Sequence, residues 1–234
     1  MKWWQLKSIL IFIKNYAQRM LYFMLFLGLM LATDLVYVIY PQEQITQHDF
    51  KIALLQSIAC CLVISFFYRR YRKQLQVSNP NHFHRQAINK KFVYFMFCMA
   101  LCCGVVSYIF DDILHVGTPE NQRLIEEMFR QTPISMTITT VLMAPILEEL
   151  LFRGIFANYF FNRSHLFWNI LAIISSSLLF ALMHEFALSV ALFYYMSIGA
   201  IFGVTYFYTR DIRYSIFLHI MMNSIAVIMI WAGV

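Results

Sequence analysis

The sequence predicts an all-α fold, a polytopic bundle of about seven transmembrane helices. Of the 234 residues, 61% are hydrophobic and only 13% are charged, and the mean hydropathy is +0.63. This balance is far from that of a soluble domain. The apolar residues also gather in runs long enough for a helix to cross a bilayer. Phenylalanine and tyrosine, with 23 and 14 residues, are abundant, as expected where aromatic rings settle at membrane interfaces.

Seven apolar runs are candidate spans. They are residues 20–40, 52–68, 92–110, 133–158, 166–183, 187–208 and 214–232. Residues 1–19 mix tryptophan, lysine and arginine with apolar side chains, so this segment either lies in the membrane interface or extends the first span. We divide the chain into residues 1–132, an N-terminal interfacial segment and three spans without a recognised motif, and residues 133–234, about four spans that carry the polar motifs.

The positive charges predict the orientation in the membrane. The net charge is +6, and Lys and Arg concentrate in the N-terminal segment, in residues 69–91, and again at Arg163 and in residues 210–213. Because Lys and Arg are retained on the cytoplasmic side, we expect the N-terminus in the cytoplasm and the C-terminus outside. No basic groove with interleaved aromatic residues is evident, so we expect no nucleic-acid partner.

Three charged residues lie inside the fourth apolar run, at Glu148, Glu149 and Arg153. A charged side chain at membrane depth costs at least roughly 2.5–3.5 kcal/mol, so these residues must pair and face a protein interior or a water-filled cavity. Glu149 and Arg153 are four residues apart and share a helix face, which predicts an ion pair. Glu148 is rotated by about 100° from Glu149. We therefore predict a structural role for Glu149 and a reactive role for Glu148.

Two further pairs with the same spacing follow, Phe180 with His184 and His219 with Asn223. Each pair lies on one face of a helix. Imidazole and carboxamide groups can polarise a carbonyl or bind a metal. A single membrane histidine or asparagine is as well explained by a hydrogen bond between helices. The occurrence of His184, His219 and Asn223 together with Glu148 favours a site that activates water.

The three motifs, Glu-Glu-x-x-x-Arg, then Phe-x-x-x-His, then His-x-x-x-Asn, resemble those of the CAAX protease and bacteriocin-processing family of intramembrane endopeptidases. The resemblance covers roughly residues 133–232, the part that we expect to be the catalytic region. It implies an intramembrane peptide-bond hydrolase, similar to CAAX prenyl protease type 2 and to bacteriocin-processing and immunity proteins. The small size suggests a protein of a bacterial cell membrane.

The resemblance also implies roles for individual residues. Glu148 would be the general base that activates water, with His184 as its partner. His219 and Asn223 would donate hydrogen bonds to the oxyanion. The supporting residues would be Glu149, Arg153 and Phe180.

Metal use stays open at this point. A metal-free mechanism dependent on glutamate is the favoured interpretation, so no cofactor is required. A catalytic zinc ion bound by Glu148, His184 and His219 would fit the same residue types, although the H-E-x-x-H signature is absent. The expected partners are a peptide or membrane-protein substrate, such as a bacteriocin precursor, and the lipid bilayer.

Two alternatives remain. One is a non-catalytic bacteriocin immunity protein or membrane scaffold, and the other is a proton-coupled transporter. Transporters of that kind usually show duplicated halves, and no such duplication is evident. A depth count also leaves a conflict: at 1.5 Å per residue, Glu148 lies roughly 15 Å and His184 roughly 28 Å from the turn between their helices. A tilted or a broken helix would reconcile these depths, and Pro145, three residues before Glu148, is expected to break or kink the fourth span.

Overall fold

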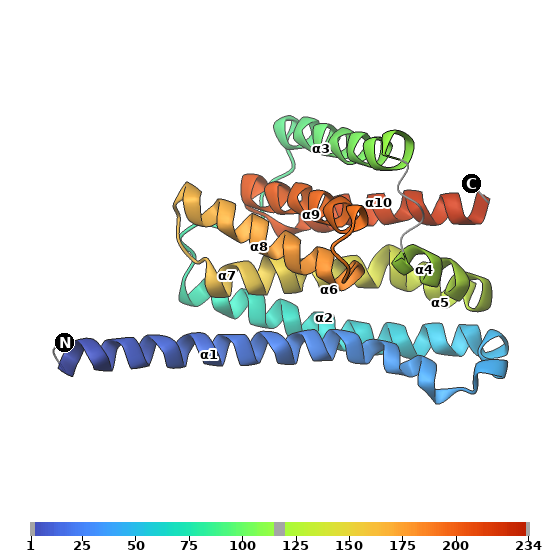
Figure 1. Ribbon diagram of the computed structural model, residues 1–234, viewed down its shortest axis with the longest axis horizontal. Helices are drawn as coiled ribbons and strands as arrows, with labels where there is room; N and C mark the ends of the chain where they lie inside the picture. The colour runs from blue at the N-terminus through green and yellow to red at the C-terminus, as the bar shows by residue number, and fades with distance from the viewer. Residues whose placement is uncertain (1–2, 115–119, 233–234) are drawn as a thin grey trace.

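The long helices run side by side in the computed structural model, which describes residues 3–114 and 120–232 and contains no β-strand in these ranges (Figure 1). The first half contains α1 (Trp3–Leu31), η1 (Ala32–Ile39), η2 (Gln42–Gln44), η3 (Thr46–His48), α2 (Asp49–Val77), α3 (Lys90–Tyr108), η4 (Ile109–Ile113) and α4 (Glu120–Gln131). The second half contains α5 (Pro133–Ile138), η5 (Thr139–Met143), α6 (Ala144–Glu149), η6 (Leu150–Phe156), α7 (Ala157–Phe160), α8 (Leu166–His184), α9 (Val190–Thr209) and α10 (Ile212–Ala232).

Seven helical segments of the described residues are long and apolar enough to cross a membrane, which confirms the predicted number. They are Ile13–Ile39, Thr46–Val77, Lys90–Asp111, Pro133–Phe160, Leu166–His184, Val190–Thr209 and Ile212–Ala232. α1 runs unbroken from Trp3 to Leu31, and the first candidate span begins within it at Ile13. The apolar core joins helices from both halves of the chain. The division at residue 132 stays a prediction.

The fourth span is continuous but unevenly wound. Its turns at η5 and η6 are π-helical and flank the α-helical turn α6. Pro145 lies in the first turn of α6, and a proline has no backbone N–H and clashes with the carbonyl one turn earlier. The wider π turn makes room for this ring, and the N–H of Ala144 reaches back five residues to Thr139. The break expected at Pro145 is not found, since Pro133–Phe160 is one continuous helical segment that accommodates the proline in a widened turn.

The basic loops meet at one end of the bundle, which we call the basic end. It comprises the loop of residues 78–89 and the turns at residues 161–165 and 210–211. The Asn81 side chain donates to the Arg163 carbonyl at 3.4 Å, and the His84 N–H donates to the Arg210 carbonyl at 2.9 Å. α1 starts at this end and α10 finishes at the other (Figure 1).

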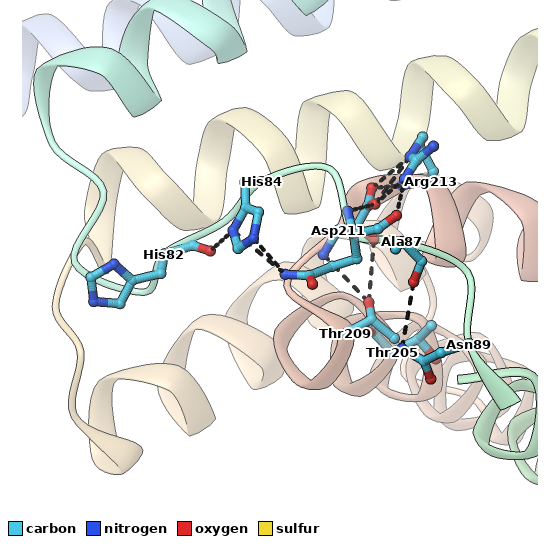
Figure 2. Close-up of polar contacts among 9 residues, drawn as sticks. His82, His84, Ala87, Asn89, Thr205, Thr209, Asp211 and Arg213 are labelled. Carbon is cyan, nitrogen blue, oxygen red and sulfur yellow. Dashed lines mark hydrogen bonds and ion pairs between the residues drawn. The ribbon is translucent and has the colours of Figure 1, made fainter. Parts of the chain in front are cut away.

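An ion pair fastens the loop of residues 78–89 to the turn before α10. Figure 2 shows the Asp211 and Arg213 side chains facing each other beside this loop, and their closest atoms are 2.6 Å apart. Asp211 also accepts from the Gln86 N–H at 2.8 Å, and Arg213 donates to the Gln86 carbonyl at 2.8 Å. Burial alone would raise the pKa of Asp211, but the hydrogen bonds from Arg213 and Gln86 outweigh burial and hold the pKa below its usual value.

The same loop closes the basic end with an aromatic side chain. Phe83 is 2% exposed and stacks on Tyr206 with ring centroids 4.3 Å apart. The Tyr206 hydroxyl accepts from the Asn158 amide at 3.1 Å and lies 3.2 Å from the Tyr71 hydroxyl. Helices α2, α7 and α9 are thereby joined beneath the loop.

Candidate active site

A buried ion pair forms the base of the site. Arg153 Nη1 lies 2.8 Å from Glu149 Oε1, and both side chains are fully buried, as the spacing of four residues predicts. Arg153 Nη2 also donates to the Gly199 carbonyl at 2.7 Å. The guanidinium carbon lies 4.9 Å from the centre of the Phe180 ring and 5.7 Å from that of Phe202. The charge of Arg153 is thus balanced by a carboxylate, a carbonyl dipole and two aromatic faces.

Gly199 makes this approach possible because it has no side chain. A Cβ atom built at Gly199 would lie 3.2 Å from Arg153 Nη2, 3.1 Å from Phe180 and 3.3 Å from the Ser177 backbone. Any larger residue would push α9 away from α8 or displace the guanidinium group.

The Glu149 carboxylate accepts hydrogen bonds from side chains of more than one helix. Besides Arg153, its Oε1 lies 3.3 Å from His219 Nδ1, and its Oε2 accepts from the Ser215 hydroxyl. Both carboxylate oxygens are therefore occupied by side chains of the fourth span and of α10.

Glu148 has the opposite environment, although it is the adjacent residue. Its side chain is 15% exposed, and its Oε2 lies 3.8 Å from His219 Nε2. That oxygen is shielded from solvent and has no hydrogen-bond partner among the described residues. A buried acceptor without a partner is costly, so Glu148 is ready to bind water or a substrate.

His184 reaches the level of this group through the tilt of α8. Figure 1 shows α8 inclined to the long axis of the bundle, and Phe180 of α8 contacts Phe152 of η6 with ring centroids 6.1 Å apart. A tilted helix was one of the two expected ways to reconcile the depths. His184 Nδ1 lies 2.8 Å from the Phe180 carbonyl, so Nδ1 carries the hydrogen. The His184 ring stacks on Tyr195 with centroids 4.7 Å apart, and Phe180 lies 5.7 Å from the ring of His219.

Asn223 faces the fourth span one turn beyond His219. Its Nδ2 donates to the Thr140 carbonyl, in the π turn η5, at 2.9 Å. One amide hydrogen is thus used, and the other stays available. Among the contacts of the described residues, none joins Glu148 directly to His184 or to Asn223. The predicted residues share one region, in which Glu148 and His219 are direct neighbours.

The arrangement does not gather the three donors proposed for zinc. No group of three or more His, Cys, Asp or Glu side chains within residues 3–114 and 120–232 is placed to bind one metal ion. Glu148 and His219 are neighbours, but the His184 ring is held by Phe180 and Tyr195 instead.

Burial changes along the fourth span at the site. Every residue from 149 to 159 is buried, whereas Glu148, His184 and Asn223 keep partial exposure. The partly exposed site residues therefore lie beyond the buried stretch that leads to the basic end.

The sequence interpretation missed three residues of this region, Ser215, Gly199 and Phe202. Ser215 had a local signal, because it precedes His219 by four residues and completes a stripe with Asn223 on α10. Gly199 and Phe202 had none, since their partners lie on other helices. Phe202 stacks on the His219 ring with centroids 4.5 Å apart.

Fold and site together define a polytopic membrane protein with glutamate, histidine and asparagine side chains inside its spans. Residues 130–225 match the family model described as type II CAAX prenyl endopeptidase Rce1-like. Over 110 residues the chain is 33% identical to the membrane peptidase YdiL of Bacillus subtilis, a match that covers 47% of this chain and 43% of YdiL.

A second relative covers more of the chain. Over 214 residues the chain is 25% identical to the membrane-embedded CAAX protease MroQ of Staphylococcus aureus, which covers 87% of this chain and 83% of MroQ. No solved structure matches. The family model and both relatives support the resemblance to the CAAX protease and bacteriocin-processing family that the motifs indicated. Both relatives are named as peptidases or proteases, so the comparisons do not favour the bacteriocin immunity alternative.

Proposed function

We propose that this protein is an intramembrane endopeptidase that hydrolyses a peptide bond with water activated by Glu148. The contrast between two adjacent glutamates is the observation that carries the proposal. Glu149 is hydrogen-bonded to Arg153, Ser215 and His219, whereas Glu148 keeps an oxygen that has no hydrogen-bond partner among the described residues. A general base needs a free carboxylate beside a space that water can enter.

The proposed reaction starts when Glu148 accepts a proton from water. The water oxygen then bonds to the carbonyl carbon, and the carbonyl oxygen becomes an oxyanion. The free amide hydrogen of Asn223 stabilises this charge. His184 Nε2, unprotonated while Nδ1–H contacts Phe180, orients the attacking water by accepting its second hydrogen.

His219 takes part through Nε2. Because Nδ1–H contacts Glu149, Nε2 donates to the oxyanion only while it holds a second proton. Glu148, 3.8 Å away, supplies the proton taken from water. When the carbon–nitrogen bond breaks, this proton passes to the leaving nitrogen. The products are a carboxylic acid and an amine, and no metal is required.

We further propose that the N-terminus is cytoplasmic, the C-terminus is outside, and substrate reaches the site from the outer half of a bacterial cell membrane. The gathering of basic loops at one end supports this orientation, and the partial exposure of Glu148, His184 and Asn223 supports this direction of entry. The substrate class is a peptide precursor or a membrane protein with a segment exposed on that side.

The test is a comparison of membranes that contain wild-type protein or the Glu148→Gln variant. Glutamine keeps the shape of glutamate but cannot act as a base, so turnover should fall by about 10²–10⁴-fold. New N-termini found by mass spectrometry should occur with wild type and be lost with Glu148→Gln. The matched control is Glu127→Gln, at an exposed position of α4, which should keep the wild-type pattern. Equal cleavage by Glu148→Gln would refute the proposal.

A further inference from the structure

Ser215 differs from an ordinary helical serine in the direction of its hydroxyl group. A serine within a helix commonly donates to the carbonyl four residues earlier, as Ser224 does to Ile220 at 2.7 Å. Ser215, which is fully buried, donates across to Glu149 Oε2 on the fourth span instead. This contact therefore joins two helices inside the site.

The contact completes the fixation of the Glu149 carboxylate. Arg153 and His219 both contact Oε1, and among the described residues Ser215 alone hydrogen-bonds to Oε2. With one oxygen held, a carboxylate can still turn about its terminal bond. With both oxygens held, Oε1 by Arg153 and His219 and Oε2 by Ser215, its plane is set.

The orientation of Glu149 in turn sets that of His219. A carboxylate only accepts hydrogen bonds, so His219 Nδ1 carries a hydrogen and Nε2 is left for the reacting groups. Stacking on Phe202 at 4.5 Å and the edge contact with Phe180 at 5.7 Å hold the plane of the ring. Nε2 then lies 3.8 Å from Glu148.

We propose that Ser215 is a positioning residue for the hydrolysis, which holds Glu149 Oε2 so that His219 keeps Nδ1–H on Glu149 and presents Nε2 to Glu148. The inference rests on the proposed function. Ser215 itself touches no reacting atom, and it acts through Glu149 and His219.

Removal of the hydroxyl group should affect turnover more than substrate binding. Without Ser215, Glu149 is held through Oε1 alone, so the carboxylate and the His219 ring gain alternative orientations. Loss of the hydrogen-bond partner that orients a metal-bound histidine typically costs about 10–100-fold in activity, and we take this range as a guide for a partner that orients His219. We expect Ser215→Ala to lower kcat by a factor in this range and to change KM little.

Two variants separate positioning from packing. Ser215→Thr keeps the hydroxyl group and should restore most of kcat. Ser224→Ala removes a hydroxyl that binds its own helix on the same span and should leave kcat unchanged. All variants are compared as full-length protein in proteoliposomes, with the thermal midpoint measured alongside kcat and KM on one peptide.

A second readout does not depend on activity. Nitrogen NMR of protein labelled at the histidine rings reports which nitrogen of His219 carries hydrogen, with His219→Gln used to assign the signal. We expect one Nδ1–H form in wild type and in Ser215→Thr, and a mixture of forms in Ser215→Ala. An unchanged His219 signal in Ser215→Ala would overturn the inference, as would wild-type kcat in that variant. If wild type hydrolyses no peptide, the proposed function fails, and the NMR comparison still decides whether Ser215 positions His219.

Discussion

Removal of the Arg153 side chain tests whether the buried ion pair holds the helices together. Arg153→Ala deletes the contact with Glu149, the donation to Gly199 and the contacts with two aromatic rings. Glu149 then keeps only Ser215 and His219 as partners. We expect the loss to appear first in stability, because the guanidinium group is bound by Glu149 and by the Gly199 carbonyl.

The magnitude follows from burial. Both members of the pair are fully buried, and loss of one partner of such a pair costs about 3–5 kcal/mol, since the other charge stays buried and uncompensated. Arg213 provides the matched control, because its side chain is 44% exposed where it pairs with Asp211. Its partner Asp211 is only 4% exposed, so loss of this half-exposed pair should cost more than the about 0–1 kcal/mol of a fully exposed pair but less than loss of the fully buried one. Arg153→Ala should therefore destabilise the protein more than Arg213→Ala.

The assay is reversible unfolding in mixed micelles, followed by circular dichroism, together with peptide hydrolysis per folded molecule. The double variant Glu149→Gln with Arg153→Met removes both charges and should regain part of the stability lost in Arg153→Ala. If Arg153→Ala is as stable as wild type yet inactive, the structural role is wrong and Arg153 belongs to the reacting groups.

Three further predictions concern the oxyanion, the close helix contact and the basic end. Asn223→Ala should lower kcat by about 10²–10³-fold with little change in KM, because the variant loses a hydrogen-bond donor to the developing oxyanion. Weakened substrate binding with an unchanged rate per bound substrate would favour the scaffold alternative. Gly199→Ala should destabilise the protein by about 1–3 kcal/mol, because the added methyl group overpacks against Arg153. The same unfolding assay measures this loss. If the variant is as stable as wild type, α9 can shift freely. Because the pKa of Asp211 is lowered in the folded protein, its stabilising contribution is complete above the ordinary aspartate pKa and is lost as pH falls through the lowered value. Proteolysis of the loop of residues 78–89 should therefore increase in acid, and Asp211→Asn should remove this dependence; the same acid response in Asp211→Asn would assign it to another group.

The spans and the pairs within one helix were predictable because they depend on local properties. Apolar run length gave the number of spans, and a spacing of four residues gave the pair of Glu149 and Arg153. The span bounds were less accurate: the second extends to Val77 rather than residue 68, because the helix continues through the basic residues beyond the apolar run. A hydropathy pattern marks the lipid-compatible part of a helix and not its end.

The contacts between helices were not predictable in the same way. The Ser215 hydroxyl, the Gly199 carbonyl and the Phe202 ring act on residues far away in sequence, so their roles depend on which helices pack together. Pro145 shows a second limit. Its missing N–H was correctly expected to disturb the helix, but whether a helix kinks or widens into a π turn depends on the neighbours that hold both sides of it.

The two adjacent glutamates show how environment divides roles between identical side chains. Both lie in one turn of one helix. Glu149 contacts Arg153 and Ser215, whereas Glu148 lies near His219 Nε2. His219 lies between them, with Nδ1 on the occupied carboxylate and Nε2 towards the free one. Two carboxylates in different surroundings commonly take different parts in acid–base chemistry. The fixed carboxylate thus determines which nitrogen of His219 the free carboxylate meets, so a change at either glutamate should alter the chemistry at the other.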